Sequence, residues 1–516
     1  MSMGKTIAKA AGVILVMNLS TKLLGFVRDL LVAKNFGATT ATDAYLVAYT
    51  IPFFLQSILG FALVTAVVPL LTKYLVEDRE EEAWRLASSI LNITFVALTA
   101  ISLVFILGAR YVVGALAPGF NPDTAALAVN LTRIMIPSLI FMSTGMVITG
   151  ILNAKYRFAV AAFAPGFSNL IIILTLVFFA NQGVHSLAIG TLVGFVGFLL
   201  LQIPVLFKTG FKYSFTFDLQ HPDIKKIMWQ IGPIVLGVAV NQVYFALNRV
   251  FASGMPEGSI AALDFGNKLM NLPLGVFVAA ISSAIFPALA AHAVKNQRDK
   301  LAQTLIKGLN LVSIITIPAA VGLIVLRTPI VKLLFERGAF TATATVATAS
   351  ALFFFSLSLM PQAANMVITR AYYAVGDVRR PLLMGVYSIA ANIIISFIAI
   401  RYLAHAGLAL ANSVAITINT FILYTGLKKH LPFMHTRAFL LELGKILTAS
   451  AGMGVVTWVC ARALVGLQGS KGLVLQVGVS VVVGIIVFMV LVSLLRSETA
   501  LGLLDDIRKK ILKRTK

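Results

Sequence analysis

Long apolar segments follow one another along the whole chain, separated by short polar or charged stretches. Apolar runs of about 20 residues can cross the hydrocarbon core of a bilayer as α-helices. A transmembrane β-barrel would instead show alternating segments of about ten residues. The pattern predicts an all-α polytopic membrane protein with about 14 transmembrane helices. The predicted spans are 8–34, 43–73, 84–108, 124–153, 158–181, 184–207, 225–252, 258–292, 302–326, 342–373, 380–403, 406–427, 438–464 and 471–496. Prolines within them, among them Pro137 and Pro273, predict kinks because each lacks a backbone N–H.

The composition favours the same class. Of the 516 residues, 59% are hydrophobic and 12% are charged, whereas an ordinary soluble domain is about 25% charged. A water-soluble fold of this size could not bury so much apolar surface, and a disordered chain would be polar. The single cysteine, Cys460, excludes an intrachain disulfide. The sequence contains no P-loop, zinc-binding HExxH or nucleophile–base motif, so we expect no enzyme activity and no bound cofactor.

The formal charge of +23 would suggest nucleic acid as a partner of a soluble protein. In a membrane protein, Lys and Arg concentrate in cytoplasmic loops and meet anionic lipid, so we expect membrane lipids and no nucleic acid as partners. With the N-terminus inside, the cytoplasmic segments hold about 28 Lys and Arg residues and the outer segments about 8. Both termini are therefore predicted to be cytoplasmic.

The two halves of the chain carry matching residues at a spacing of about 220 residues. Met146–Thr149 and Met366–Thr369 have the same four-residue sequence. Further pairs match in type at nearly this spacing: Arg28 with Arg249, Asp43 with Asp264, and Pro52 with Pro273. Repeats in parallel orientation are typical of transporters that bind substrate between two lobes. The predicted parts are an N-lobe at 1–215 (spans 1–6), a C-lobe at 216–432 (spans 7–12), and spans 13–14 with a basic tail at 433–516.

A small set of ionisable side chains falls inside the predicted spans: Lys22, Arg28, Asp29, Asp43, Arg249, Asp264 and Lys268. A charge at the bilayer centre costs about 2.5–3.5 kcal/mol or more, so these groups should face one another or a water-filled cavity. Ion pairs that lock helices together are one interpretation. The symmetry of Arg28 and Arg249 favours the other, a cationic cavity for an anionic ligand such as a phosphate or diphosphate. Asp264 and Lys268 are four residues apart on one helix face.

Several segments resemble a known family. They are GFVRD at 25–29, TDAY at 42–45, LLFERGAF at 333–340 and RAYYAVGD at 370–377. The chain is similar over most of 15–430 to the MurJ/MviN family of lipid II flippases, which belongs to the MOP superfamily together with the MATE exporters. The resemblance implies 14 spans, two six-helix lobes, two extra C-terminal helices that form a groove for a lipid tail, and a cationic central cavity. It also implies a bacterial inner (cytoplasmic) membrane location and a role in peptidoglycan synthesis.

The resemblance implies roles for particular residues in binding the substrate. Arg28, Asp29 and Asp43 stand in matching motifs, and Lys268 takes the place of the usual Arg. Gln56 occupies a position where members usually have an Arg in the second span. Asn248 and Ser396 replace acidic residues that some members use for cation coupling.

The function expected from these observations is translocation of lipid II from the inner to the outer leaflet by alternating access. Coupling to the membrane potential or to a monovalent cation stays open. We expect a monomer, with cell-wall synthesis proteins as further partners. The alternatives are a flippase for another polyprenyl-linked glycan, a cation-coupled MATE-type multidrug exporter, and a non-transporting scaffold that kept the fold.

Overall fold

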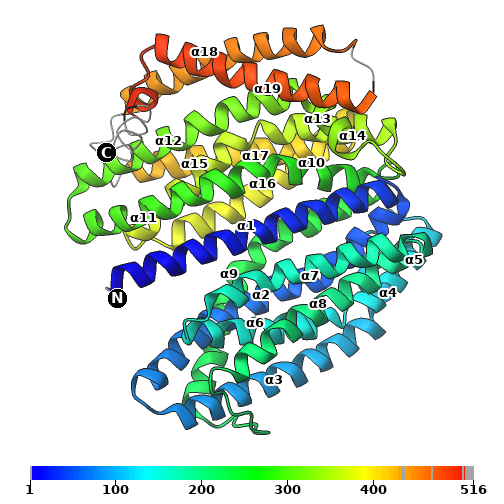
Figure 1. Cartoon of the computed structure of the whole chain (residues 1–516), viewed down its shortest axis with the longest axis vertical. Helices are drawn as coiled ribbons and strands as arrows, with labels where there is room; N and C mark the ends of the chain where they lie inside the picture. The colour runs from blue at the N-terminus through cyan, green and yellow to red at the C-terminus, as the bar shows by residue number, and fades with distance from the viewer. Residues whose placement is uncertain (1–2, 429–430, 432–435, 467–468, 503–504, 506–516) are drawn as a thin grey trace. The chain divides into compact units, whose positions relative to one another are not determined.

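The computed structural model describes residues 3–428, 431, 436–466, 469–502 and 505. Over these residues every regular element is a helix (Figure 1). The chain divides into two compact units: Met1–Ala261 with Arg337–Thr341, and Ala262–Glu336 with Ala342–Lys516. The two-lobe duplication expected from the sequence, with boundaries after 215 and 432, stays a prediction.

The first unit contains α1 to α9. Their bounds are α1 Met3–Phe36, α2 Thr40–Val76, α3 Glu80–Leu107, α4 Ala109–Leu116, α5 Pro122–Met135, α6 Ser138–Ala154, α7 Phe158–Phe179, the 3₁₀ turn η1 Ala180–Gln182, α8 Val184–Phe207 and α9 Pro222–Ser253. Helix α10 (Ser259–Pro273) begins in the first unit and continues into the second.

The second unit holds the remaining helices. They are the π-helical turn η2 Leu274–Val278, α11 Ala279–Val294, α12 Arg298–Val325, α13 Arg327–Phe335, α14 Ala342–Ser356, α15 Leu359–Ala374, α16 Arg379–Leu403, α17 His405–Lys428, α18 Thr436–Ala463 and α19 Gly469–Leu494.

The helices match the predicted spans. Among the described residues, 11 helices are long and apolar enough to cross a membrane, or up to 12 if α14 and α15, bent by 43°, form one span. The predicted spans 8–34 and 225–252 correspond to α1 and α9, which have 34 and 32 residues but are not among these 12. The structure confirms the all-α membrane class, and the predicted count of 14 is approximate.

Two of the predicted kinks coincide with breaks in the helices. Pro137 lies between α5 and α6, and Pro273 ends α10 directly before the π-helical turn η2. Each proline removes a hydrogen bond that a continuous α-helix needs. Both breaks lie inside stretches, Pro122–Ala154 and Ser259–Val294, that are each long and apolar enough to form one span.

A non-helical connection joins α8 to α9 and is fastened to α3. The Ser88 and Ser89 hydroxyls accept from the backbone N–H groups of Ser214 (3.1 Å) and Asp218 (2.7 Å). The Asn92 side-chain amide donates to the carbonyls of Ser214 and Thr216. These bonds satisfy backbone groups that a helix would have paired, and they fix the point from which α9 starts.

The short segment Arg337–Thr341 belongs to the first unit because it pairs with the end of α1. The Ala339 N–H donates to the Lys34 carbonyl at 2.8 Å. Gly37, which follows α1 and has φ +64°, lies so close that a Cβ there would be 2.3 Å from the Ala339 carbonyl oxygen. Only glycine fits both the left-handed conformation and this approach.

Helices α6 and α8 approach each other closely at a glycine. A Cβ added to Gly145 would lie 2.3 Å from a ring carbon of the buried Phe198. Gly145→Ala should therefore overpack the contact and lower the free energy of unfolding by about 1–3 kcal/mol. Thermal unfolding of the purified protein in detergent measures this.

Gly114→Ala in α4 is the matched control, because nothing lies within 4 Å of its Cβ position and alanine is the better helix former. Equal melting temperatures for the two variants would contradict the close packing of α6 on α8.

Candidate functional site

The predicted site residues divide between the two units. Six belong to the first unit: Lys22, Arg28, Asp29, Asp43, Gln56 and Arg249. Asp264 and Lys268 belong to the second. Each group is described within its own unit below, and the binding role of all eight stays a prediction.

Arg28 is held in place from two sides. Its Nη2 and Nε donate to Asp29 Oδ1 at 2.9 and 3.2 Å. Its Nη1 donates to the Asn169 side-chain oxygen on α7 at 2.9 Å. Gly25 lies beside this amide, since a Cβ there would be 3.4 Å from Asn169 Nδ2, an ordinary van der Waals distance. The structure thus pairs Arg28 with Asp29, and its second partner, Asn169, was not among the residues selected from the sequence.

The arrangement leaves Arg28 able to bind a further anion. A guanidinium has five N–H donors, and the bonds above use three of them. The Arg28 side chain is 23% exposed, and that of Asp29 is 12% exposed. A guanidinium whose direction is already fixed loses little conformational freedom when it binds phosphate oxygens.

Asp43 is held by hydrogen bonds from backbone N–H groups. It is buried in the first turn of α2. Its two carboxylate oxygens accept from the N–H groups of Gly258 (2.8 Å) and Ala261 (2.7 Å). These N–H groups lie at the start of α10, where a carboxylate is favoured because helix N-terminal donors have no partner within the helix.

Arg249 contacts the same turn, with Nη1 donating to the Ile260 carbonyl at 3.4 Å. Gly258 makes the turn possible, with φ +79° and a Cβ position only 2.1 Å from the Ala38 carbonyl oxygen. Asp43 and Arg249 therefore both stabilise the connection from α9 to α10.

Lys268 and Asp264 form the ion pair that their spacing predicts. The Lys268 ammonium lies 2.9 Å from Asp264 Oδ2 and 5.6 Å from the ring centroid of Phe265. The side chains are 35% and 19% exposed. Lys268 is therefore held by an ion pair while part of its side chain stays exposed.

Lys22 and Gln56 lie on different helices of the first unit. Lys22 is exposed on α1, and Gln56 is half-buried on α2. Next to Gln56, the Ser57 hydroxyl accepts from Gln242 Nε2 of α9 at 2.6 Å. This bond joins α2 to α9, and neither residue was predicted from the sequence. Within the described part of the chain, no three His, Cys, Asp or Glu side chains are arranged to hold a metal ion.

The structure predicts that Asp43 contributes strongly to stability. Asp43→Ala would leave two buried N–H groups without an acceptor and should cost about 1.5–3 kcal/mol of unfolding free energy. Asp43→Asn keeps one acceptor oxygen and should lose less. The measurement is the melting temperature in detergent, and the control is Asp123→Ala, which changes an exposed acid. Asp43→Ala should melt at the lowest temperature, Asp43→Asn at an intermediate one and the control at the highest. An Asp43→Ala protein as stable as the control would refute this capping role.

Comparison with known proteins finds similarity over nearly the whole chain. The sequence model of a family described as lipid II flippase MurJ matches residues 32–491. A relative from Vibrio cholerae, named "Probable lipid II flippase MurJ", is 30% identical over 471 residues, which are 89% of this chain and 90% of the relative.

Solved structures show the same similarity. One titled "Lipid II flippase MurJ, inward closed conformation" has a TM-score of 0.79 and 26% identity, covering 93% of this chain and 98% of the other. An inward-facing MATE-family multidrug transporter of the MOP superfamily has a TM-score of 0.67 at 15% identity, covering 83% and 99%. The MATE similarity shows a shared fold alone.

Proposed function

This chain belongs to the MurJ family, and we propose from that membership that it translocates lipid II from the inner to the outer leaflet. The match of the family model over 32–491 carries the proposal. It is supported by relatives named as lipid II flippases and by the fold shared with a solved lipid II flippase. The many apolar helices make the chain a multi-pass membrane protein.

The geometry at Arg28 suggests how the diphosphate of lipid II is bound. Arg28, aimed by Asp29 and Asn169, offers its remaining N–H donors to phosphate oxygens, the pairing for which a guanidinium fork is best suited. Arg249 and Lys268 are further cations for the same task. Gln56 supplies an uncharged amide, so phosphate binding relies on the other positions.

The proposed activity moves a lipid by alternating access and breaks no covalent bond, so the protein acts as a transporter and uses no cofactor. Its driving force is the membrane potential or a monovalent cation. Moving one charge through 100 mV supplies about 2.3 kcal/mol. We further propose that the protein is a monomer in the bacterial inner membrane, surrounded by membrane lipids and working beside cell-wall synthesis proteins.

The other functions have less support. A MATE-type multidrug exporter shares only the fold. A flippase for another polyprenyl-linked glycan would use the same diphosphate chemistry, and the departure at Gln56 is the observation in its favour. A non-transporting scaffold would have no use for the fixed direction of Arg28.

Complementation tests the function directly. In a bacterium depleted of its own MurJ, this chain should restore growth and the appearance of lipid II at the outer surface. Arg28→Ala should abolish rescue, and Arg28→Lys should restore it only in part, because lysine lacks the fork. Arg110→Ala, which changes an exposed arginine on α4, should rescue like the wild type.

Rescue by Arg28→Ala at equal membrane abundance would contradict the role of Arg28. Failure of the wild-type chain, despite normal membrane insertion, would contradict lipid II as the cargo and favour another polyprenyl-linked glycan.

The proposed orientation places both termini in the cytoplasm and can be tested by cysteine labelling. In a Cys460→Ser background, Asn181→Cys lies between α7 and α8 and should react with a membrane-impermeant maleimide in intact cells. Glu81→Cys lies at the start of α3 and should react only after permeabilisation. Both positions are exposed. The reverse labelling pattern would mean that the topology is opposite to the one proposed.

A further inference from the structure

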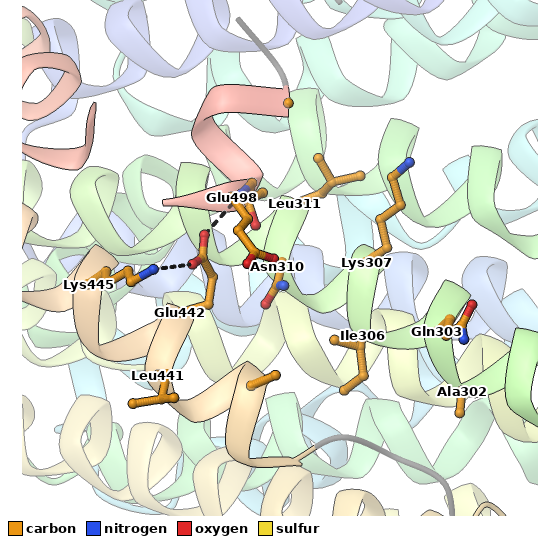
Figure 2. Close-up of a pocket in the computed structure, with 13 residues that line it drawn as sticks. Ala302, Gln303, Ile306, Lys307, Asn310, Leu311, Leu441, Glu442, Lys445 and Glu498 are labelled. Atoms are coloured by element: carbon orange, nitrogen blue, oxygen red, sulfur yellow. Dashed lines mark hydrogen bonds and ion pairs between the residues drawn. The ribbon is translucent and has the colours of Figure 1, made fainter. Parts of the chain in front are cut away.

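A cavity of about 740 Å³ lies in the second unit between the start of α12, the start of α18 and the residues that follow α19 (Figure 2). Its size is that of a small-molecule site. Ile306, Leu311 and Leu441 form apolar parts of its wall. Lys307, Asn310 and Glu498 add polar groups.

One wall is fixed by contacts within the chain. The buried Glu442 carboxylate of α18 accepts from the Thr499 N–H at 3.1 Å and from the Ser497 hydroxyl. Lys445 Nζ donates to the Arg496 carbonyl at 2.9 Å and lies 3.7 Å from Glu442. These bonds fasten the segment after α19 to α18. Glu442 and Lys445 are therefore occupied in shaping the cavity.

Three other polar groups of the lining take no part in fastening the segment after α19 to α18. The Asn310 side-chain oxygen is buried and accepts no hydrogen bond from the described residues. Lys307 and Glu498 are exposed and form no ion pair within the described part of the chain. In Figure 2, Glu498 lies beside Asn310, and the Lys307 ammonium lies on another side of the cavity. A buried acceptor without a donor is costly, so a ligand that donates N–H there would be stabilising.

The cavity lies where the helices leave the apolar part of the membrane. Uncharged runs occupy 308–325 of α12, 446–461 of α18 and 472–494 of α19. The charged lining residues Lys307 and Lys445 stand directly before the first two runs, and Glu498 stands four residues after the end of the third. A ligand at this level has its polar part among lipid headgroups and its apolar part in the bilayer.

We propose that this cavity binds a bilayer phospholipid whose headgroup carries a primary ammonium, of the phosphatidylethanolamine type. The ammonium donates to the Glu498 carboxylate and the Asn310 oxygen, and the phosphate pairs with Lys307. The acyl chains lie along Ile306, Leu311 and Leu441. A choline headgroup has no N–H to give to Asn310, and a headgroup with net negative charge would be repelled by Glu498. This lipid is a resident ligand and not the translocated cargo.

The test measures lipid binding to the purified full-length chain in detergent. Native mass spectrometry compares phosphatidylethanolamine, its mono- and dimethylated forms, phosphatidylcholine and phosphatidylglycerol, all with the same acyl chains. We expect binding to weaken stepwise with methylation, by about tenfold in total, as charge-assisted hydrogen bonds are lost. This series uses the unaltered protein, so misfolding of a variant cannot explain its result.

Variants then locate the site. Glu498→Gln should reduce binding of phosphatidylethanolamine to the level of phosphatidylcholine, and Lys307→Gln should weaken both lipids. Glu81→Gln, an exposed acid in the first unit, should change neither. Equal binding of the ethanolamine and choline lipids by the wild type would overturn the proposal, as would unchanged preference in Glu498→Gln. Tightest binding of phosphatidylglycerol would also overturn it and indicate an anionic-lipid site.

Discussion

A charge inside a bilayer needs a partner, and this requirement shapes every embedded ionisable group whose contacts the structure shows. Arg28 is paired with Asp29 and an amide on α7, and Lys268 is paired with Asp264. Asp43 is satisfied by backbone N–H groups. Each of these pairings also fixes the direction in which the side chain points, because a paired side chain in an apolar setting has few other stable positions. Pairing, which membrane insertion requires, thereby also fixes the direction of the Arg28 guanidinium.

The sequence was sufficient for the fold class because the signals that determine it are local. The length of an apolar run decides whether a segment can cross the bilayer, and each predicted span has a helical counterpart. A proline acts on the turn in which it stands, as Pro137 and Pro273 do. The Asp264–Lys268 pair was predictable for the same reason, since residues four apart on a helix are neighbours.

The remaining parts of the site depend on contacts between residues far apart in sequence. Asn169, the partner of Arg28, is on α7, and no spacing rule connects the two. The sequence marked Asp43 as an embedded acid, but the contact of its carboxylate with the start of α10 could not be read from any spacing. That contact requires the left-handed turn at Gly258, whose position relative to α2 is settled only by tertiary packing.

The connection between α8 and α9 has a consequence for how this protein tolerates sequence change. The connection is held against α3 largely by the side chains of Ser88, Ser89 and Asn92. Their partners include main-chain groups of the connection. Main-chain groups are the same for every residue except proline. Substitutions at exposed positions of the connection therefore keep these bonds, whereas substitutions at the three α3 positions remove them. The geometry of the connection is thus encoded largely in a helix that is distant from it in the sequence.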